Sequence, residues 1–306
     1  MKLLHTGDLH LGKSLHETSL LEDQSWMLDR LADALAQDTY AALIIAGDVY
    51  DRAVPGADAV QLFSGFLIRL RRDFPALDIC IIPGNHDSAQ RLSFADEILG
   101  ERHIHIICNP ANSFTPIMLS RDGEKAALFL LPFLAPGTLE KGAAPTQPAP
   151  PSSAAVLPTG SSAATAGAPS PSPGAHALPE FDFDAPDEPG KPDDAASEDR
   201  TAPILSSQAD LAAEAARRFD EVLTHTEFEH LPSILVAHLF TLAGKQSESE
   251  RLFLGTAEQV SPALFSRFSY VALGHLHRSQ RITPRMHYSG SPLAYAFDEA
   301  GSEKSF

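Results

Sequence analysis

The segment Ile79-Cys80-Ile81-Ile82-Pro83-Gly84-Asn85-His86-Asp87 joins a short apolar run to a turn that carries polar side chains. Successive apolar residues closed by Pro and Gly predict a buried strand that ends in a tight turn. The Asn, His and Asp side chains of this turn are groups that can hold a metal ion or move a proton. Alone, such a triplet is also what an ordinary turn contains, so its interpretation depends on the rest of the chain.

Four further apolar runs end in the same way. The polar groups that follow them are Asp8-Leu9-His10, Gly47-Asp48-Val49-Tyr50-Asp51, His238 and Gly274-His275-Leu276-His277. Ligands of open α/β sheets bind just beyond the carboxyl ends of the strands, so strands placed side by side would bring all these side chains together. Each group singly could be a helix cap or a buried core histidine. Five of them in one chain favour a shared site.

Apolar spacing predicts strands that alternate with helices in the first part of the chain. The expected strands cover 3–6, 42–46, 79–82, 104–108, 116–119, 126–131, 234–237, 270–273 and 286–288, with a further strand beginning after 298–301. The expected helices cover about 20–37, 55–72, 92–99 and a segment after Ser207 and Asp210, which resemble a capping box. The strands between 104 and 131 leave little room for helices, which favours a partly antiparallel or mixed sheet. Patterning alone therefore predicts an α/β fold with mixed sheets.

Residues 143–203 differ in composition from the rest of the chain. They hold 13 of the 24 prolines and 15 alanines, and their nine acidic and two basic residues give a net charge of −7. Such a segment has too little apolar surface to offset the entropy of ordering its backbone. We therefore expect a disordered Pro/Ala/Ser-rich acidic insertion at 143–203. It interrupts a discontinuous domain formed by 1–142 and 204–306, which we expect to continue beyond Phe306.

The chain of 306 residues is acidic, with a formal net charge of −17. This argues against a generally basic nucleic-acid-binding protein, so any such contact would come from a local patch, a bound metal or a partner. No run approaches the roughly 18 apolar residues of a membrane span, and the first residues lead directly into a motif rather than a signal peptide. Cys80 and Cys108 lie in apolar runs as expected free thiols, so the sequence favours a cytoplasmic protein without a membrane anchor.

The candidate ligands are carboxylates, an amide and imidazoles, with no thiolate among them. This set of donor atoms suits Mn²⁺, Fe²⁺ or Zn²⁺. One carboxylate can bridge two ions about 3.5–4 Å apart, an arrangement that supports in-line displacement at phosphorus and lowers the pKa of an attacking water. The pattern therefore favours a two-metal centre that hydrolyses a phosphate ester.

The five motifs resemble those of the calcineurin-like metallophosphoesterase superfamily. Three surrounding stretches narrow the resemblance to SbcD-type DNA double-strand-break nucleases: His5-Thr6-Gly7-Asp8-Leu9-His10-Leu11-Gly12, Gly84-Asn85-His86-Asp87-Ser88 and Gly290-Ser291-Pro292. The resemblance covers about 1–140 and 204–306. It implies a four-layer α/β fold in which two packed mixed β-sheets are flanked by helices.

The resemblance also implies a role for each motif residue. The metal ligands it implies are Asp8, His10 and His277 for one ion, Asn85, His238 and His275 for the other, and Asp48 as the bridge between them. His86 would act beside the phosphate as the acid or transition-state stabiliser. Asp51 would orient His86 by accepting its other ring proton.

The activity implied by the resemblance is hydrolysis of DNA phosphodiester bonds by two divalent ions, with Mn²⁺ as the expected metal. In this family it combines a 3′-to-5′ exonuclease on duplex ends with an endonuclease on single strands and hairpins, in DNA repair, recombination and replication. The implied partners are an SbcC-like ATPase and a second copy of the chain, bound through helices near 56–72 and 92–100.

Two alternative functions stay open at this point. One is a phosphomonoesterase or cyclic-nucleotide phosphodiesterase on the same dimetal site. The other is an inactive metal-binding scaffold subunit. The presence of both Asp51 and His86 argues against the scaffold, since a scaffold needs ligands but no acid.

Three arginines are candidates for contacts with the phosphate backbone. Arg52 completes a Gly-Asp-x-x-Asp-Arg pattern typical of protein serine/threonine phosphatases, where the arginine grips phosphate, but Ala53 and Asp87 depart from that branch. Arg91 and Arg278 lie in segments that follow ligand strands. A solvated surface charge or salt bridge is the alternative for each, and nothing in the set predicts base-specific readout.

Overall fold

The computed structural model describes residues 1–94, 96–142, 205–228, 230–246 and 259–306. These residues belong to one compact unit that joins Met1–Pro148 to Ala202–Phe306. The insertion predicted at 143–203 lies outside the described residues. Within the described part of the chain, no helix is long and apolar enough to cross a membrane.

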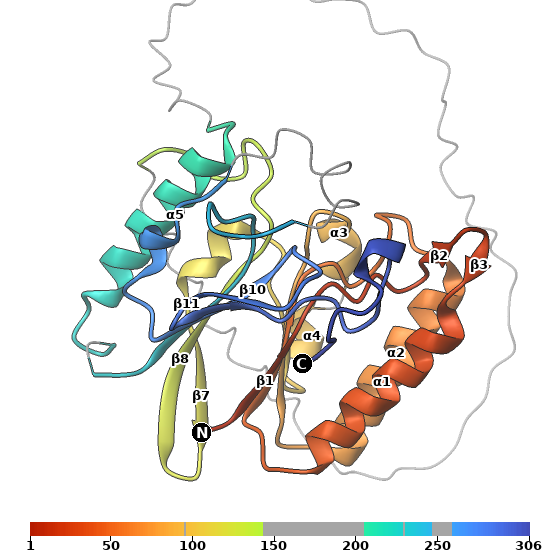
Figure 1. Cartoon of the computed structure of the whole chain (residues 1–306). Helices are drawn as coiled ribbons and strands as arrows, with labels where there is room; N and C mark the ends of the chain where they lie inside the picture. The colour runs from red at the N-terminus through yellow and green to blue at the C-terminus, as the bar shows by residue number, and fades with distance from the viewer. Residues whose placement is uncertain (95, 143–204, 229, 247–258) are drawn as a thin grey trace, which may run out of the picture. The chain divides into compact units, whose positions relative to one another are not determined.

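The first sheet contains four parallel strands, and two long helices cover one of its faces (Figure 1). Its strands, in spatial order, are β1 (Leu3–Thr6), β4 (Ala42–Ala46), β5 (Asp78–Ile82) and β6 (Ile104–Ile106). The helices are α1 (Leu21–Ala36) and α2 (Ala57–Asp73). Helix α1 buries residues three and four apart, among them Met27, Leu31 and Leu35, which is the apolar stripe that the sequence predicts.

The second sheet is mixed. Its six strands, in spatial order, are β11 (Gln280–Thr283), β12 (Met286–Tyr288), β10 (Tyr270–Gly274), β9 (Ser233–His238), β8 (Glu124–Leu131) and β7 (Ile117–Arg121). The inner strands pair in parallel, whereas the outermost pairs β7–β8 and β11–β12 are antiparallel. The mixed sheet expected from the short connections is therefore present, and α5 (Gln208–Leu223) covers its outer face.

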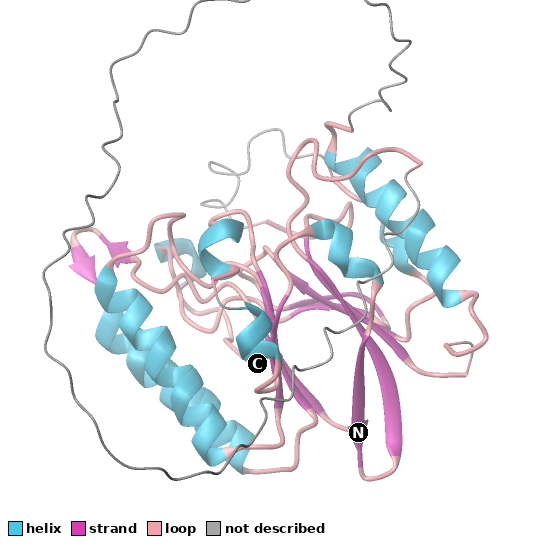
Figure 2. Ribbon diagram, turned by 180° about the vertical axis from the view of Figure 1, so that it is seen from behind, coloured by secondary structure: helices cyan, strands magenta, loops and turns pink. Residues whose placement is uncertain are grey.

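Three apolar cores stack the elements into four layers, which both ribbon views show from opposite sides (Figures 1 and 2). Between the two sheets, Ile44 and Ile82 pack with Leu128 and Val236. Alternate residues of the same strands, such as Ile45, face α1 and α2 instead. Parallel strands that are buried on both faces read as continuous apolar runs, which is why these runs stand out in the sequence. The four-layer fold implied by the resemblance is confirmed.

Two predicted elements differ in the structure. The single helix expected at 92–99 is replaced by two short helices, α3 (Ala89–Leu92) and α4 (Asp96–Gly100). The Ser93 hydroxyl donates back to the Gln90 carbonyl, a local bond that competes with continuation of the helix. The strand expected after 298–301 is absent from the described residues, where η3 (Phe297–Glu299) forms a 3₁₀ turn closed by the Tyr295 amide on the Glu299 carboxylate.

Other short elements complete the described chain. The Ser207 hydroxyl accepts the Asp210 amide at 3.0 Å, so the predicted cap begins α5. Patterning did not predict β11 or the small hairpin that follows the first ligand turn, because neither contains a run of apolar side chains. The hairpin consists of β2 (Ser14–Leu15) and β3 (Thr18–Ser19), and two further 3₁₀ turns are η1 (Pro110–Phe114) and η2 (Pro262–Phe265).

Candidate metal centre

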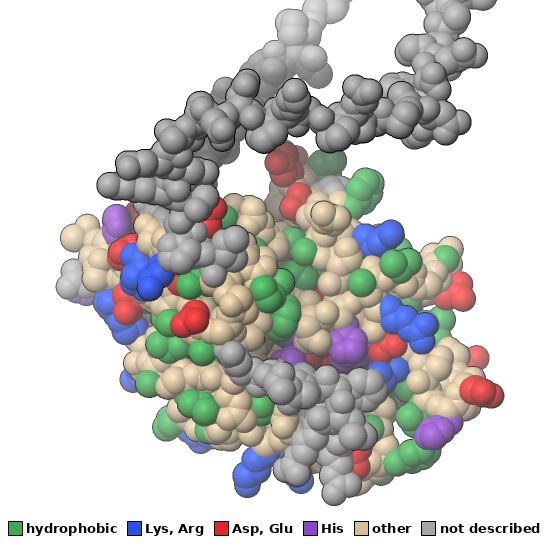
Figure 3. Space-filling view, turned by 90° about the horizontal axis from the view of Figure 1, so that it is seen from above, with side chains coloured by type: hydrophobic (Ala, Val, Ile, Leu, Met, Phe, Trp, Pro, Cys, Tyr) green, Lys and Arg blue, Asp and Glu red, His purple; other side chains and the backbone are tan. Residues whose placement is uncertain are grey.

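The carboxyl ends of the parallel strands in both sheets bring the motif side chains to one region. Asp8 follows β1, Asp48 follows β4, Asn85 and His86 follow β5, and His238 ends β9. In the view from above, His side chains are visible near the middle of the face with acidic side chains beside them, and Lys and Arg lie on several sides of it (Figure 3). The structure thus brings together the seven side chains proposed as ligands, which form two neighbouring groups.

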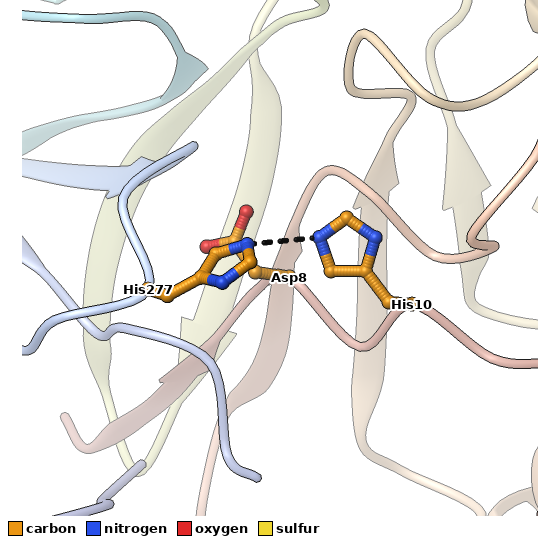
Figure 4. Close-up of side chains that lie close together, drawn as sticks. All are labelled: Asp8, His10 and His277. Atoms are coloured by element: carbon orange, nitrogen blue, oxygen red, sulfur yellow. Dashed lines mark hydrogen bonds between the residues drawn. The ribbon is translucent and has the colours of Figure 1, made fainter. Parts of the chain in front are cut away.

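The first group consists of Asp8, His10 and His277, whose potential ligand atoms lie within 4.8 Å of one another. The His10 and His277 rings come from opposite sides of the group, and their Nε2 atoms are 3.1 Å apart (Figure 4). Nδ1 of His277 lies 2.7 Å from Oε1 of Glu299. A carboxylate accepts hydrogen bonds, so the His277 proton resides on Nδ1 and its Nε2 lone pair faces His10.

The second group consists of Asn85, His238 and His275. Oδ1 of Asn85 lies 3.0 Å from Nε2 of His238 and 2.9 Å from Nδ1 of His275, and the two nitrogens are 3.2 Å apart. Nδ1 of His238 donates to the Ala46 carbonyl at 2.9 Å, so Nε2 is the atom that faces the group. Burial lowers the pKa of His238, but the charge of Asp48 outweighs this effect and raises it to about 9, so Nε2 would release its proton when an ion binds.

Asp48 lies between the two groups. Its Oδ2 is 3.6 Å from Nε2 of His10 and 3.4 Å from Nε2 of His238. Its Oδ1 accepts the backbone amide of His86 at 2.9 Å, which fixes the orientation of the carboxylate. One oxygen that faces both groups has the position required of a bridging ligand.

The chemistry of these atoms fits two divalent cations. Lone pairs directed at one another repel unless a positive charge lies between them. Burial lowers the pKa of His275 to about 3 and that of His10 well below its ordinary value, so both imidazoles are neutral donors of a lone pair. Burial also raises the pKa of Asp8 to about 7. An adjacent cation would stabilise the ionised form of this carboxylate.

The backbone at these strand ends adopts conformations that cost energy. Asp8, His10 and Asp48 have positive φ angles of 54°, 43° and 49°, and His275 has one of 104°. Non-glycine residues in such conformations persist only where the surrounding structure holds them, and they concentrate at functional sites. At Gly84 an added Cβ would lie 2.1 Å from Oδ1 of Asp48, so only glycine lets the Asn85-His86 turn approach this carboxylate.

His86 lies beside both groups and is held through its backbone and ring. It forms a group with His10 and Asp48 whose potential ligand atoms lie within 4.8 Å, and its Nδ1 is 3.0 Å from the backbone oxygen of Asp51. The expected partner of the His86 ring was the Asp51 carboxylate, whereas the structure places the Asp51 backbone oxygen there. The Asp51 carboxylate turns to Nζ of Lys13 at 2.7 Å and lies 3.6 Å from Nδ1 of His10.

Comparisons with known proteins identify the family that shares these motifs. Residues 1–135 match the family model described as calcineurin-like phosphoesterase. The matched segment contains the first three of the five motifs. Over its whole length it is 32% identical to the SbcD subunit of the nuclease SbcCD from Bacillus subtilis (strain 168), and 28% identical to the subunit of the same name from Staphylococcus saprophyticus.

The chain spans 65% and 64% of the length of these two curated relatives. Among solved structures, the protein TT1561 of Thermus thermophilus is similar with a TM-score of 0.43 and 11% identity, over 94% of this chain and 88% of that one.

Several residues that position the candidate metal ligands were not predicted. Glu299 fixes His277 and is itself bound by Nζ of Lys304 at 2.8 Å. Although burial raises the pKa of Glu299, its hydrogen bond with His277 and the charge of Lys304 outweigh this effect and bring it to about 2. The Asp87 carboxylate accepts the amides of Val49, Tyr50 and Gly84 and thereby joins two ligand turns.

Gln24 and Tyr295 hold the first ligand turn from behind. Gln24 donates to the His10 carbonyl at 2.7 Å and accepts the Gly12 amide at 2.9 Å. The Tyr295 hydroxyl donates to the Leu9 carbonyl, and its ring packs edge-on against His10. Gln24 occupies a position of the apolar stripe of α1, and a polar residue there was the one available signal of this role.

The three arginines lie at the surface of the protein. The Arg52 side chain is 79% exposed, and its Nε lies 3.7 Å from the Asp51 carboxylate. Arg91 and Arg278 are also exposed. Arg91 lines the groove between α2 and α3. A phosphate contact by any of them remains a proposal, and the structure favours Arg52 as a partner of Asp51.

Proposed function

We propose that this chain is a metal-dependent DNA nuclease that hydrolyses phosphodiester bonds with two divalent ions, Mn²⁺ being the expected metal. The observation that carries the proposal is the pair of ligand groups with Asp48 between them and His86 beside them. The names of two relatives, both nuclease subunits, support DNA as the substrate.

The residues divide the work as follows. Asp8, His10 and His277 would hold one ion, Asn85, His238 and His275 would hold the other, and Asp48 would be a ligand shared by both. When bound, the ions supply charge neutralisation at the phosphate and a lowered pKa for the attacking water.

The structure leaves one atom of His86 to act on the substrate. A carbonyl can only accept, so Nδ1 of His86 donates to the Asp51 backbone oxygen. Nε2 is then the atom left to face the substrate, and it can give a proton or hydrogen bond to a phosphate or leaving-group oxygen when the ring is the imidazolium, with a proton on each nitrogen. General acid help of this kind contributes roughly 10²–10⁴-fold in rate.

The finer proposal follows the resemblance to the SbcD-type nucleases. It comprises a 3′-to-5′ exonuclease on duplex ends, an endonuclease on single strands and hairpins, and an SbcC-like ATPase as partner in cytoplasmic DNA repair and recombination. The acidic charge of −17 supports a requirement for the ions or a partner in holding DNA, since the chain offers no general basic surface.

The test is cleavage of labelled blunt duplex, hairpin and single-stranded DNA with Mn²⁺, and again with a chelator. Parallel reactions with bis(p-nitrophenyl) phosphate and p-nitrophenyl phosphate distinguish a diesterase from the alternative monoesterase. We expect metal-dependent cleavage of DNA and of the diester. Rapid hydrolysis of the monoester alone would contradict the proposal, and retained ions without hydrolysis of any substrate would support the scaffold alternative.

A homodimer through the α2 and α3–α4 surface is the second part of the proposal. Ile68 of α2 and Phe94 expose 67% and 83% of their surface and line a groove of about 820 Å³, and Ile98 of α4 is 69% exposed. Exposed apolar residues that gather in this way mark interaction sites. We expect Ile68→Glu with Phe94→Glu to convert a dimer to a monomer in light scattering, whereas Trp26→Glu on α1, which is 60% exposed, should leave the dimer intact. A monomeric wild-type chain would contradict this part.

A further inference from the structure

A second group of metal-ligating side chains lies at the amino ends of the strands in the first sheet, away from the centre described above. It consists of Asp78, His103 and His105, here called the amino-end triad. Asp78 begins β5, His105 lies in β6, and His103 immediately precedes that strand. The three potential ligand atoms lie within 4.8 Å of one another.

Two of the distances in the triad are close to those between ligands of one ion. Oδ1 of Asp78 lies 3.0 Å from Nδ1 of His103 and 2.9 Å from Nε2 of His105. A tetrahedral ion with bonds of about 2.0–2.1 Å places its ligand atoms about 3.3 Å apart. The proposed ligands of the metal centre, in the same molecule, approach one another at 2.9–3.2 Å within the second group. The triad therefore needs only a small expansion to hold an ion.

The chemistry of the triad also suits a cation. Burial by itself raises the pKa of Asp78, but hydrogen bonds from His105 and His103 outweigh that effect and lower it, so the carboxylate is ionised. No described residue bonds the second nitrogen of either ring, so each imidazole can carry its proton there and turn a lone pair inward. Two imidazoles and a carboxylate form a set that binds Zn²⁺ and leaves a fourth position for water.

The simpler interpretation is a carboxylate shared by two hydrogen-bonding imidazoles with no ion. The charge of Arg71 favours this interpretation, because it interacts with Asp78. However, the Arg71 guanidinium is directed to backbone carbonyls, including those of Phe74, Leu77 and Arg102. The Asp78 oxygen that faces both imidazoles therefore remains available to an ion.

We propose that the amino-end triad binds one divalent transition ion of the zinc class and fastens the edge strand β6 to β5. β6 is the last strand of its sheet and pairs only with β5 among the described strands. Helix α4 packs directly against β6. An ion at Asp78, His103 and His105 thus stabilises the segment that carries the exposed Ile98. This proposal does not depend on the nuclease function.

The experiment counts ions per chain by mass spectrometry after equilibration with Zn²⁺ and dialysis. We expect the double variant Asp78→Asn, His105→Gln to retain one ion fewer than wild type. The matched control removes two exposed imidazoles elsewhere, His225→Gln with His230→Gln, and should retain the wild-type number. The same loss of one ion should appear when the triad variants are made in an Asp48→Ala background. In that background the metal centre is already impaired, so a further loss reports on ion binding at the triad.

A second measurement keeps the proposal testable if the double variant folds poorly. His103→Gln changes a side chain that is 56% exposed, so its fold is expected to be unperturbed. In the Asp48→Ala background, alone or combined with His225→Gln and His230→Gln, Zn²⁺ should raise the melting temperature. When His103→Gln is added to the same background, this rise should be lost. Equal ion counts and equal Zn²⁺-induced rises in the triad variants and the control would overturn the proposal.

Discussion

The metal centre and the amino-end triad use the same kinds of side chain at opposite ends of the same parallel strands, but their surroundings differ. At the centre, Asp8, His10 and His238 are almost fully buried, and the second nitrogen of His238 or His277 is held by a carbonyl or a carboxylate. In the triad, His103 is 56% exposed and no described residue holds its second nitrogen. The centre is therefore arranged before an ion binds, whereas the triad is free to adjust around one.

The metal centre and the amino-end triad also differ in backbone conformation. Four proposed ligands of the centre adopt positive φ angles, whereas in the triad only His103 does. Each such residue costs of order 1–3 kcal/mol and requires support from its surroundings. Asp87 and Gln24 give that support through bonds to the ligand turns. The two regions therefore differ more in the residues behind the candidate ligands than in the ligands themselves.

The largest effect is expected from Asp48→Ala. Its Oδ2 faces both ligand groups, so its removal should abolish binding of both ions at the centre and with it DNA cleavage. Ion counting with Mn²⁺ checks this. Two ions retained at the centre would show that Asp48 is not a bridging ligand.

His86→Leu should reduce DNA cleavage by roughly 10²–10⁴-fold while both Mn²⁺ ions and DNA affinity are retained. We propose this because Nδ1 of His86 lies 3.0 Å from the Asp51 backbone oxygen beside the ligand groups, where the ring can act as a proton donor. Single-turnover cleavage and ion counting on the same preparation measure both properties. Loss of an ion would instead show that His86 is a metal ligand, and near wild-type cleavage would show that it has no catalytic role.

Glu299→Gln should weaken Mn²⁺ binding at the centre by about 10–100-fold, the range for partners that orient a ligating histidine. The amide lacks the charge that fixes the proton on Nδ1 of His277. Isothermal titration with Mn²⁺ measures the change, and Glu303→Gln, an exposed neighbour, is the matched control. Equal affinity in the two variants would show that the support behind the ligands has no energetic effect.

Asp51→Asn should have a smaller effect, a loss of no more than about tenfold in cleavage. The substitution keeps the backbone oxygen that accepts Nδ1 of His86 and changes only the carboxylate beside Lys13 and His10. Cleavage rates of Asp51→Asn and His86→Leu measured side by side check the order. A loss as large as that of His86→Leu would restore the carboxylate as the group that orients His86.

The smallest effect is expected from residues that support neither region. We propose that 143–203 is an insertion in a domain formed by 1–142 and 204–306, because its composition offers little to a core. Its replacement by a short Gly/Ser linker should shift the melting temperature by less than about 2 °C, the equivalent of under about 1 kcal/mol. Calorimetry and Mn²⁺ counting check this, and a large fall in either would place the segment in the fold.

The sequence predicted those parts of the structure that depend on local pattern. Continuous apolar runs mark β4, β5 and β10 because these strands are buried on both faces, and the polar residues after them gather because parallel strands share an edge. The positions of the metal-ligand candidates therefore followed from pattern, although their roles came from the resemblance.

Other features could not be predicted, because they depend on contacts between residues distant in sequence. Glu299 lies 22 positions from His277, and Tyr295 lies 286 positions from Leu9, whose carbonyl it bonds. No local pattern records either pairing. The choice between carbonyl and carboxylate at Asp51 depends on where Lys13 lies, which only the fold determines.

The most direct test of the two-ion centre is anomalous diffraction from crystals of the chain grown with Mn²⁺. The structure predicts two anomalous peaks at the carboxyl ends of the strands. One should be ligated by Asp8, His10 and His277, the other by Asn85, His238 and His275, and Asp48 should contact both. A single peak there, or two peaks without Asp48 between them, would contradict the account.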